Sequence, residues 1–206
     1  MESVLNPPPL RVLVNAVSAK MGGAANYIRH LALEMAAWPG LECIFVVPEQ
    51  EAKALGEING IRVIASSASH AGPLRRLWFD QVTLRHLDIR EKTDVLYSTA
   101  NMGMLFPPCR QVLLVRNALH FSDYYLSVLL PREGWRARLE NWLRRQLISG
   151  SVRSSDVVIT PTRAMLNEVM RFISIPEDPW VNSSCEAQVR SLLSRVPYGL
   201  GITPAV

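Results

Sequence analysis

The sequence predicts an α/β protein with a doubly wound, mainly parallel sheet. Short apolar runs alternate with segments of helical periodicity, and each run is continuously apolar instead of alternating with polar residues. Continuous apolarity is typical of strands covered on both faces, and strand–helix alternation is typical of doubly wound folds. The predicted strands are residues 10–17, 43–47, 61–65, 95–97, 112–115 and 157–160.

Helices are predicted between these strands, at 24–35, 74–87, 135–148 and 163–172. The first carries Ala24, Ile28, Leu31, Ala32 and Met35 at the spacing of a single helical stripe. A chain of 206 residues has room for one large domain. We expect an N-terminal extension over 1–9, one domain over 10–196, and the start of a linker over 197–206.

Composition excludes several classes of protein. With 49% hydrophobic and 19% charged residues, the chain is globular and not disordered. Its net charge of +4 permits an anionic partner without requiring one. Cys43, Cys109 and Cys185 form no C-x-x-C pair, which argues against a disulfide scaffold or a zinc site. Neither a secretory signal nor a membrane-spanning apolar run is evident, so we expect a soluble, cytoplasmic-type protein.

Ligands of doubly wound sheets bind at the carboxyl ends of the strands, so the loops there are candidate sites. The loop after the first strand contains Lys20, Gly22 and Gly23. Glycines allow a close approach of the backbone, and the N-terminus of the following helix attracts anions. The pair is neither a dinucleotide fingerprint nor a P-loop, and a plain tight turn explains it equally well.

Two further loops carry polar side chains. Ser98, Thr99 and Asn101 follow the fourth strand, where they could hold sugar hydroxyls or simply cap the next turn. Arg116 and Asn117 follow the fifth strand. His120 stands near Asp123 in the same loop, which suggests an oriented acid/base pair, although a solvated loop histidine is the more common case.

The 135–153 segment combines five arginines and one glutamate with an apolar stripe. The stripe consists of Trp135, Leu139, Trp142, Leu143 and Leu147. A basic helix with tryptophans on one face can lie on an anionic membrane, but packing on the sheet explains the stripe as well and is the favoured interpretation. Nucleic-acid binding and a metal site are not supported, because no motif of either kind occurs.

Taken in order, five segments resemble the N-terminal, Rossmann-like half of a GT-B glycosyltransferase of the family 4 (group 1) type. They are RVLVNAVSAKMGGAANYIRHLALEMA (11–36), RLWFDQVTLRHL (76–87), DVLYSTANMGMLFPPCRQVLLVRNALHF (94–121), DVVITPTRAMLNEV (156–169) and VPYGL (196–200). The resemblance implies transfer of a sugar from a nucleotide-sugar donor to a glycan or glycolipid acceptor, as in polysaccharide biosynthesis, without an obligatory metal. Within such an enzyme the N-terminal domain mainly binds the acceptor.

The resemblance also implies roles for the polar loops. Gly22 and Gly23, with Lys20 as an additional cation, would approach the donor diphosphate. The loops that contain Ser98, Thr99, Asn101, Arg116 and Asn117 would face the acceptor and the transferred sugar, and His120 is the candidate catalytic group.

The donor-binding domain of that family is not part of this sequence. We therefore expect the chain to be inactive alone, with the nucleotide sugar bound by a C-terminal domain or a separate subunit. An alternative is a non-catalytic subunit that binds the acceptor or the inner face of an anionic membrane and recruits a donor-binding partner.

Overall fold

A computed structural model describes residues 8–20, 22–70, 72–117, 119–173 and 180–182. A seven-stranded sheet with the order β3-β2-β1-β4-β5-β6-β7 forms its centre, and every neighbouring pair is parallel. The strands are β1 (Leu10–Asn15), β2 (Leu41–Pro48), β3 (Ile61–Ser66), β4 (Val95–Ser98), β5 (Arg110–Leu114), β6 (Val157–Thr160) and β7 (Trp180–Asn182).

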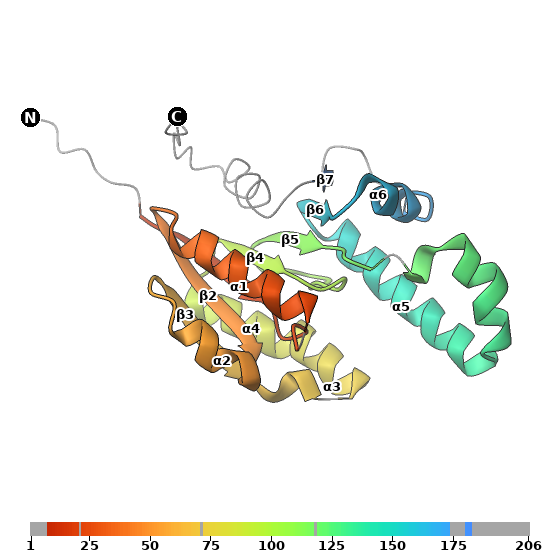
Figure 1. Cartoon of the computed structure of the whole chain (residues 1–206), viewed down its shortest axis with the longest axis horizontal. Coiled ribbons are helices and arrows are strands. Elements are labelled where there is room, and N and C mark those ends of the chain that lie inside the picture. The colour runs from red at the N-terminus through yellow and green to blue at the C-terminus, as the bar shows by residue number, and fades with distance from the viewer. Residues whose placement is uncertain (1–7, 21, 71, 118, 174–179, 183–206) are drawn as a thin grey trace, which may run out of the picture.

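The strand order confirms the predicted doubly wound, Rossmann-like sheet. From β1 the chain first winds outward through β2 to β3, and then returns to add β4 on the other side of β1 (Figure 1). The winding direction therefore changes between β1 and β4. Loops that leave these two strands diverge, which opens a crevice at the carboxyl edge of such sheets.

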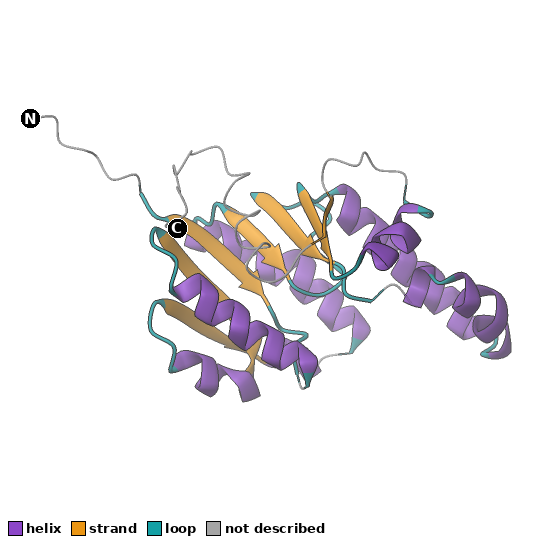
Figure 2. Ribbon diagram, turned by 45° about the horizontal axis from the view of Figure 1, so that its top comes forward, coloured by secondary structure: helices purple, strands orange, loops and turns teal. Residues whose placement is uncertain are grey.

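Helices cover both faces of the sheet (Figures 1 and 2). The α-helices are α1 (Gly23–Ala36), α2 (Glu49–Gly56), α3 (Pro73–Trp78), α4 (Leu84–Glu91), α5 (Trp135–Arg153) and α6 (Arg163–Met170). The π-helical turn η2 (Phe79–Thr83) connects α3 to α4. Short helical turns η3 (Leu119–Phe121), η4 (Tyr125–Leu129) and η5 (Leu130–Arg132) precede α5. Sequence periodicity predicted neither α2 nor these short turns.

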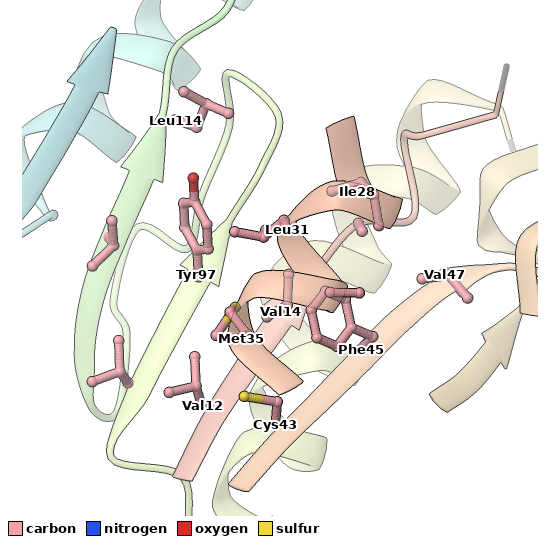
Figure 3. Close-up of a cluster of buried hydrophobic side chains, with 14 of the residues drawn as sticks. Val12, Val14, Ile28, Leu31, Met35, Cys43, Phe45, Val47, Tyr97 and Leu114 are labelled. Atoms are coloured by element: carbon pink, nitrogen blue, oxygen red, sulfur yellow. The ribbon is translucent and has the colours of Figure 1, made fainter. Parts of the chain in front are cut away.

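The main core lies between α1 and the sheet (Figure 3). Ile28, Leu31 and Met35 of α1 are buried against strand residues such as Phe45 and Tyr97. This confirms the stripe predicted for this helix, with Ala24 at its half-buried margin. Burial of such side chains in a continuous layer is the dominant favourable contribution to folding.

The opposite face of the sheet has its own core. Leu84 of α4 packs with Leu13 and Leu96 of the strands. Further along the sheet, Ile148 and Val152 of α5 pack against β5 and β6. Because the inner strands β1, β4 and β6 are covered on both faces, their residues are mostly apolar without alternation, as the sequence indicates, whereas the edge strand β3 is only partly buried.

The N-terminal half of α5 corrects one expectation. Trp135, Leu139, Trp142 and Leu143 were expected to pack on the sheet, but all four side chains are exposed, and Leu147 is half-buried. Only the C-terminal half of the helix contacts the sheet, because α5 has 19 residues and β6 has four. The first turns of α5 extend beyond the sheet, beside the short turns that precede it (Figures 1 and 2).

Most of the predicted extension, Cys185 and the predicted linker over 197–206 lie outside the described residues. In the part of the chain that the structure describes, no helix is both long and apolar enough to cross a bilayer.

Candidate functional site

A cavity of about 240 Å³ opens at the carboxyl edge of the sheet, where the winding direction changes between β1 and β4. It combines loops that follow β1, β4 and β5 with one turn of the α3–η2 segment. The lining residues are Ser18, Arg76, Asp80, Ala100, Asn101, Met102, Arg116 and Asn117. Three of the eight, Asn101, Arg116 and Asn117, are site residues predicted from the sequence. A polar hollow at this position in a doubly wound sheet is the expected ligand site.

A buried carboxylate organises one wall of the cavity. Asp80 accepts hydrogen bonds from Arg76 Nε (2.8 Å) and Nη2 (3.1 Å), and from Asn15 Nδ2 (3.1 Å). Asp80 and Asn15 are both buried, so the carboxylate depends on these donors to replace water. The two-pronged contact fixes the guanidinium of Arg76 at the edge of the cavity.

Sequence reasoning missed this group. Arg76 and Asp80 stand at i and i+4 in a helical segment, which looks like an ordinary surface pair. The available signal was Asn15, a polar residue inside an otherwise apolar central strand, since a buried amide requires hydrogen-bonding partners.

Asn101 joins two of the loops. Its Oδ1 accepts hydrogen bonds from the backbone N–H groups of Arg116 (2.8 Å) and Asn117 (3.1 Å), and its Nδ2 donates to the carbonyl of Asn117 (3.0 Å). Three contacts use most of the capacity of one amide. Asn101 therefore acts mainly as a brace that places the β5 loop beside the β4 loop.

Arg116 supplies a cation to the cavity. Its guanidinium carbon lies 5.7 Å from the ring centroid of Tyr27, and the Tyr27 hydroxyl lies 2.6 Å from the Tyr97 hydroxyl. Within the described ranges no carboxylate forms an ion pair with Arg116. Since Asp80 is matched by Arg76, the positive charge of Arg116 remains for an anionic or strongly polar ligand.

Ser98 and Thr99 do not line the cavity. Both are buried, and Thr99 Oγ1 donates a hydrogen bond to the carbonyl of Asn15 (2.9 Å). Ser98 Oγ has no hydrogen-bond partner among the described residues. That these two side chains hold sugar hydroxyls stays a prediction.

The glycine loop stands beside the cavity, at the start of α1. Gly22 has φ of 64°, a left-handed conformation that side chains disfavour, and the space where its Cβ would stand is open. Gly23 begins the helix, and no side chain caps the helix or places an acid in its first turn. The loop is exposed, as is Lys20. The N–H groups of an uncapped first turn favour an anion.

His120 lies away from this cavity. Its Nδ1 lies 2.7 Å from Asn141 Oδ1, and because the amide oxygen only accepts, Nδ1 is the donor in this pair. The suggested partner Asp123 instead pairs with Arg171 Nη1 at 3.0 Å. His120 lines a hollow of about 130 Å³ with Tyr125, Glu133, Ala137, Glu140, Asn141 and Arg144. Its catalytic role stays a prediction.

A third and larger hollow, of about 1020 Å³, lies between the carboxyl ends of β2 and β3 and the α3–α4 segment. It is lined in part by Trp78, His70 and Arg75, and contains none of the site residues predicted from the sequence. In the described part of the chain, no group of three His, Cys, Asp or Glu side chains is arranged to hold a metal ion.

Comparison with known proteins extends these observations. The sequence profile of Glycosyltransferase Family 4 matches residues 21–181. A crystal structure of UDP-N-acetylglucosamine 2-epimerase superposes with a TM-score of 0.53 at 12% identity, over 85% of this chain and 48% of that one. A glycosyltransferase from Rickettsia africae ESF-5 gives a TM-score of 0.49 at 11% identity, over 84% and 42%. No curated protein sequence matches significantly.

The chain spans about half the length of these two solved structures. At 12% identity the epimerase likeness shows the fold alone, a Rossmann-like domain. The family profile covers well over half of the sequence and agrees with the resemblance that the motifs indicate. The chain therefore belongs to glycosyltransferase family 4.

Proposed function

We propose that this chain is the N-terminal, acceptor-side domain of a glycosyltransferase that moves a sugar from a nucleotide-sugar donor to a glycan or glycolipid acceptor. The observation that carries the proposal is the polar cavity at the β1–β4 switch point, with Arg116 left unmatched inside it. A family 4 domain needs an acceptor site, and this hollow combines neutral hydrogen-bonding groups with a cation.

The acceptor contacts would come from Asn117 and Arg116. Asn117 is exposed, its backbone is held by Asn101, and its Oδ1 accepts from the Leu119 N–H, so its Nδ2 can donate to a sugar hydroxyl without a large loss of loop entropy. Arg116, supported on the ring of Tyr27, would stabilise negative charge that develops during transfer. Arg76 has less freedom, because Asp80 already holds two of its nitrogens.

The donor would approach from the side of the glycine loop. The uncapped first turn of α1 offers N–H groups and the positive end of a helix dipole to a diphosphate, and Lys20 adds a mobile charge. Charge stabilisation of the departing diphosphate requires no metal in this scheme. His120 would take part only if the acceptor extends from the cavity toward the turns before α5.

We also propose that the chain alone turns over no nucleotide sugar. The cavity is one wall of an active site, and a site with one wall neither fixes the donor nor excludes water. The donor would be bound by another domain or by a separate subunit. In the second case the chain would be the acceptor-binding subunit of an assembly.

The test is a titration of the isotopically labelled 206-residue chain followed by NMR. Neutral and anionic oligosaccharides are expected to shift amide signals of residues 100–102 and 116–117, and Arg116→Ala is expected to weaken the binding about tenfold, as loss of a charged hydrogen bond does. Arg110→Ala, at the opposite edge of the sheet, is the matched control. Saturable binding of a nucleoside diphosphate alone at micromolar concentration, or steady turnover of a nucleotide sugar, would contradict the proposal.

A further inference from the structure

An apolar surface on α5 has no covering element among the described residues. This surface, called the α5 apolar face, consists of Trp135, Leu139, Trp142 and Leu143, whose exposed fractions are 70%, 49%, 53% and 47%. Isolated exposed apolar side chains are ordinary on proteins, but four large ones on adjacent turns form a patch of the kind that marks a contact with another phase or molecule.

Helical geometry places these four side chains together. At about 100° per residue, positions i, i+4, i+7 and i+8 fall within an arc of roughly 100°. Ile148 and Val152, which pack against the sheet, lie on nearly the opposite side of the same helix. The α5 apolar face therefore points away from the body of the domain, on the part of the helix that extends past the sheet (Figure 1).

Arginines border the α5 apolar face. Arg136 stands on one side of it and Arg138 on the other, by the same helical spacing. Arg136 lies with its guanidinium carbon 5.6 Å from the ring centroid of Trp135. Across the whole helix there are five arginines and one glutamate, so α5 has a net charge of +4, equal to that of the entire chain.

We propose that the α5 apolar face binds the surface of an anionic lipid bilayer, with the helix axis parallel to the membrane plane. Tryptophan favours the interfacial layer because its ring is apolar and its N–H can meet polar headgroups. Leucines beside it enter the acyl boundary, while flanking arginines reach lipid phosphates. Exposed Trp and Leu between two arginines is the arrangement that this chemistry requires.

Charge favours a bilayer over a second copy of the chain. Two α5 apolar faces packed against each other would bring Arg136 and Arg138 of one copy close to those of the other, and like charges at an interface are costly. The nearest acid, Glu140, is already paired with Arg144 on a different side of the helix. An anionic lipid surface satisfies both arginines at once. The inference does not depend on the proposed transferase function.

The experiment is flotation of the 206-residue chain with lipid vesicles. We expect the chain to float with vesicles of equal parts phosphatidylglycerol and phosphatidylcholine, and to bind pure phosphatidylcholine far more weakly. Binding should fall in high salt, because screening removes the contribution of the arginines. Trp135→Ala with Trp142→Ala is expected to lower the vesicle partition coefficient about tenfold or more.

Two matched controls test whether binding depends on the α5 apolar face itself or on exposed tryptophans and arginines in general. Trp78→Ala removes a tryptophan that is 66% exposed on α3 and should leave flotation unchanged. Arg136→Gln with Arg138→Gln should weaken binding to the anionic vesicles, whereas Arg110→Gln, an exposed arginine at the start of β5, should not. All variants are checked for native circular dichroism.

A second measurement does not depend on loss of binding. Brominated phosphatidylglycerol is expected to quench the tryptophan fluorescence of the unaltered chain, and Trp135→Phe with Trp142→Phe should keep binding but abolish most of that quenching. The proposal is overturned if the chain does not float, or if the double alanine variant, Trp135→Ala with Trp142→Ala, floats as well as the unaltered chain. A dimer that is lost in the double alanine variant, together with no vesicle binding, would assign the face to a second copy.

Discussion

Two helices of this domain carry the same kind of apolar stripe and use it differently. In α1 the stripe of Ile28, Leu31 and Met35 is wholly buried against the sheet. In α5 the stripe that begins at Trp135 is exposed, and a different side of the helix packs on the strands. An apolar stripe therefore predicts that one face of a helix will be covered, but it does not identify the element or partner that covers it.

The largest expected difference lies in the free energy of unfolding. Leu31→Ala removes a fully buried side chain from α1 and should destabilise the domain by about 3 kcal/mol. Leu143→Ala removes the same atoms from the α5 apolar face and should change the stability by less than about 0.5 kcal/mol. Urea denaturation followed by circular dichroism compares the two, and equal losses would mean that the α5 apolar face is packed in solution.

The next prediction concerns Asp80, a buried carboxylate of η2 that lines the cavity. Asp80→Ala leaves Arg76 and Asn15 without their shared acceptor, and loss of one partner from a buried ion pair should cost about 3 kcal/mol. Asp80→Asn keeps the shape and one acceptor and should cost less. Denaturation of the two variants at neutral pH gives the comparison. If Asp80→Ala were as stable as the original chain, Asp80 would not organise the wall of the cavity.

Asp88 of α4 shows that a packed helix can also bury a charge near the amino edge of the sheet. Burial raises the pKa of its carboxyl to about 6, although the hydrogen bond from Cys109 and the positive charge of Arg85 act in the opposite direction. In the unfolded chain the pKa stays near 4, so the folded state holds the proton more tightly. Stability therefore falls as pH rises from about 4 to about 6, and is constant in this respect below and above that window.

Asp88→Asn removes this dependence. The variant should unfold at a nearly constant urea concentration across pH 4 to 6, and at pH 7.5 it should be more stable than the original chain by roughly 2 kcal/mol. Urea denaturation curves of both proteins over this pH range and at pH 7.5 provide the measurement. If the stability of both proteins fell equally between pH 4 and 6, a group other than Asp88 would be responsible.

The smallest expected effect concerns Asn101. Asn101→Ala breaks the brace between the β4 and β5 loops and should lower stability by about 1 kcal/mol, since its hydrogen bonds are partly exposed to water. Hydrogen exchange of the backbone N–H groups of Arg116 and Asn117 should accelerate more than that of the sheet. Unchanged exchange at these two amides would contradict the role of Asn101 as a brace.

Sequence periodicity predicted the six principal strands and the buried stripe of α1, because continuous burial leaves a signal in every residue. It missed α2, which has eight residues and few apolar side chains in contact with the core. It also missed Arg76 and Asp80, whose partner Asn15 stands 65 residues before Asp80. Asn15 in its apolar strand signals that a buried polar partner exists, but the local pattern does not identify that partner, because it depends on which segments the sheet order brings together.

The candidate site also shows where prediction from local sequence fails. Position after a strand selected Asn101, Arg116 and Asn117, which line the cavity, but also Ser98 and Thr99, which are buried and do not line it. The difference is one of strand length, since β4 continues through Ser98. The pairing suggested between His120 and Asp123 was wrong, because α5 offers Asn141 to the histidine and Arg171 reaches the aspartate.

α5 runs antiparallel to the strands, since it returns the chain to the start of β6. Its first turn, with Trp135, therefore stands on the side of the domain where the carboxyl ends of the strands lie, as does the cavity. A bilayer that held this helix would hold the cavity mouth near its own surface. An acceptor carried on a lipid would then reach the cavity by diffusion in the plane of the membrane. Its effective concentration at the cavity would be well above its average concentration in the cell.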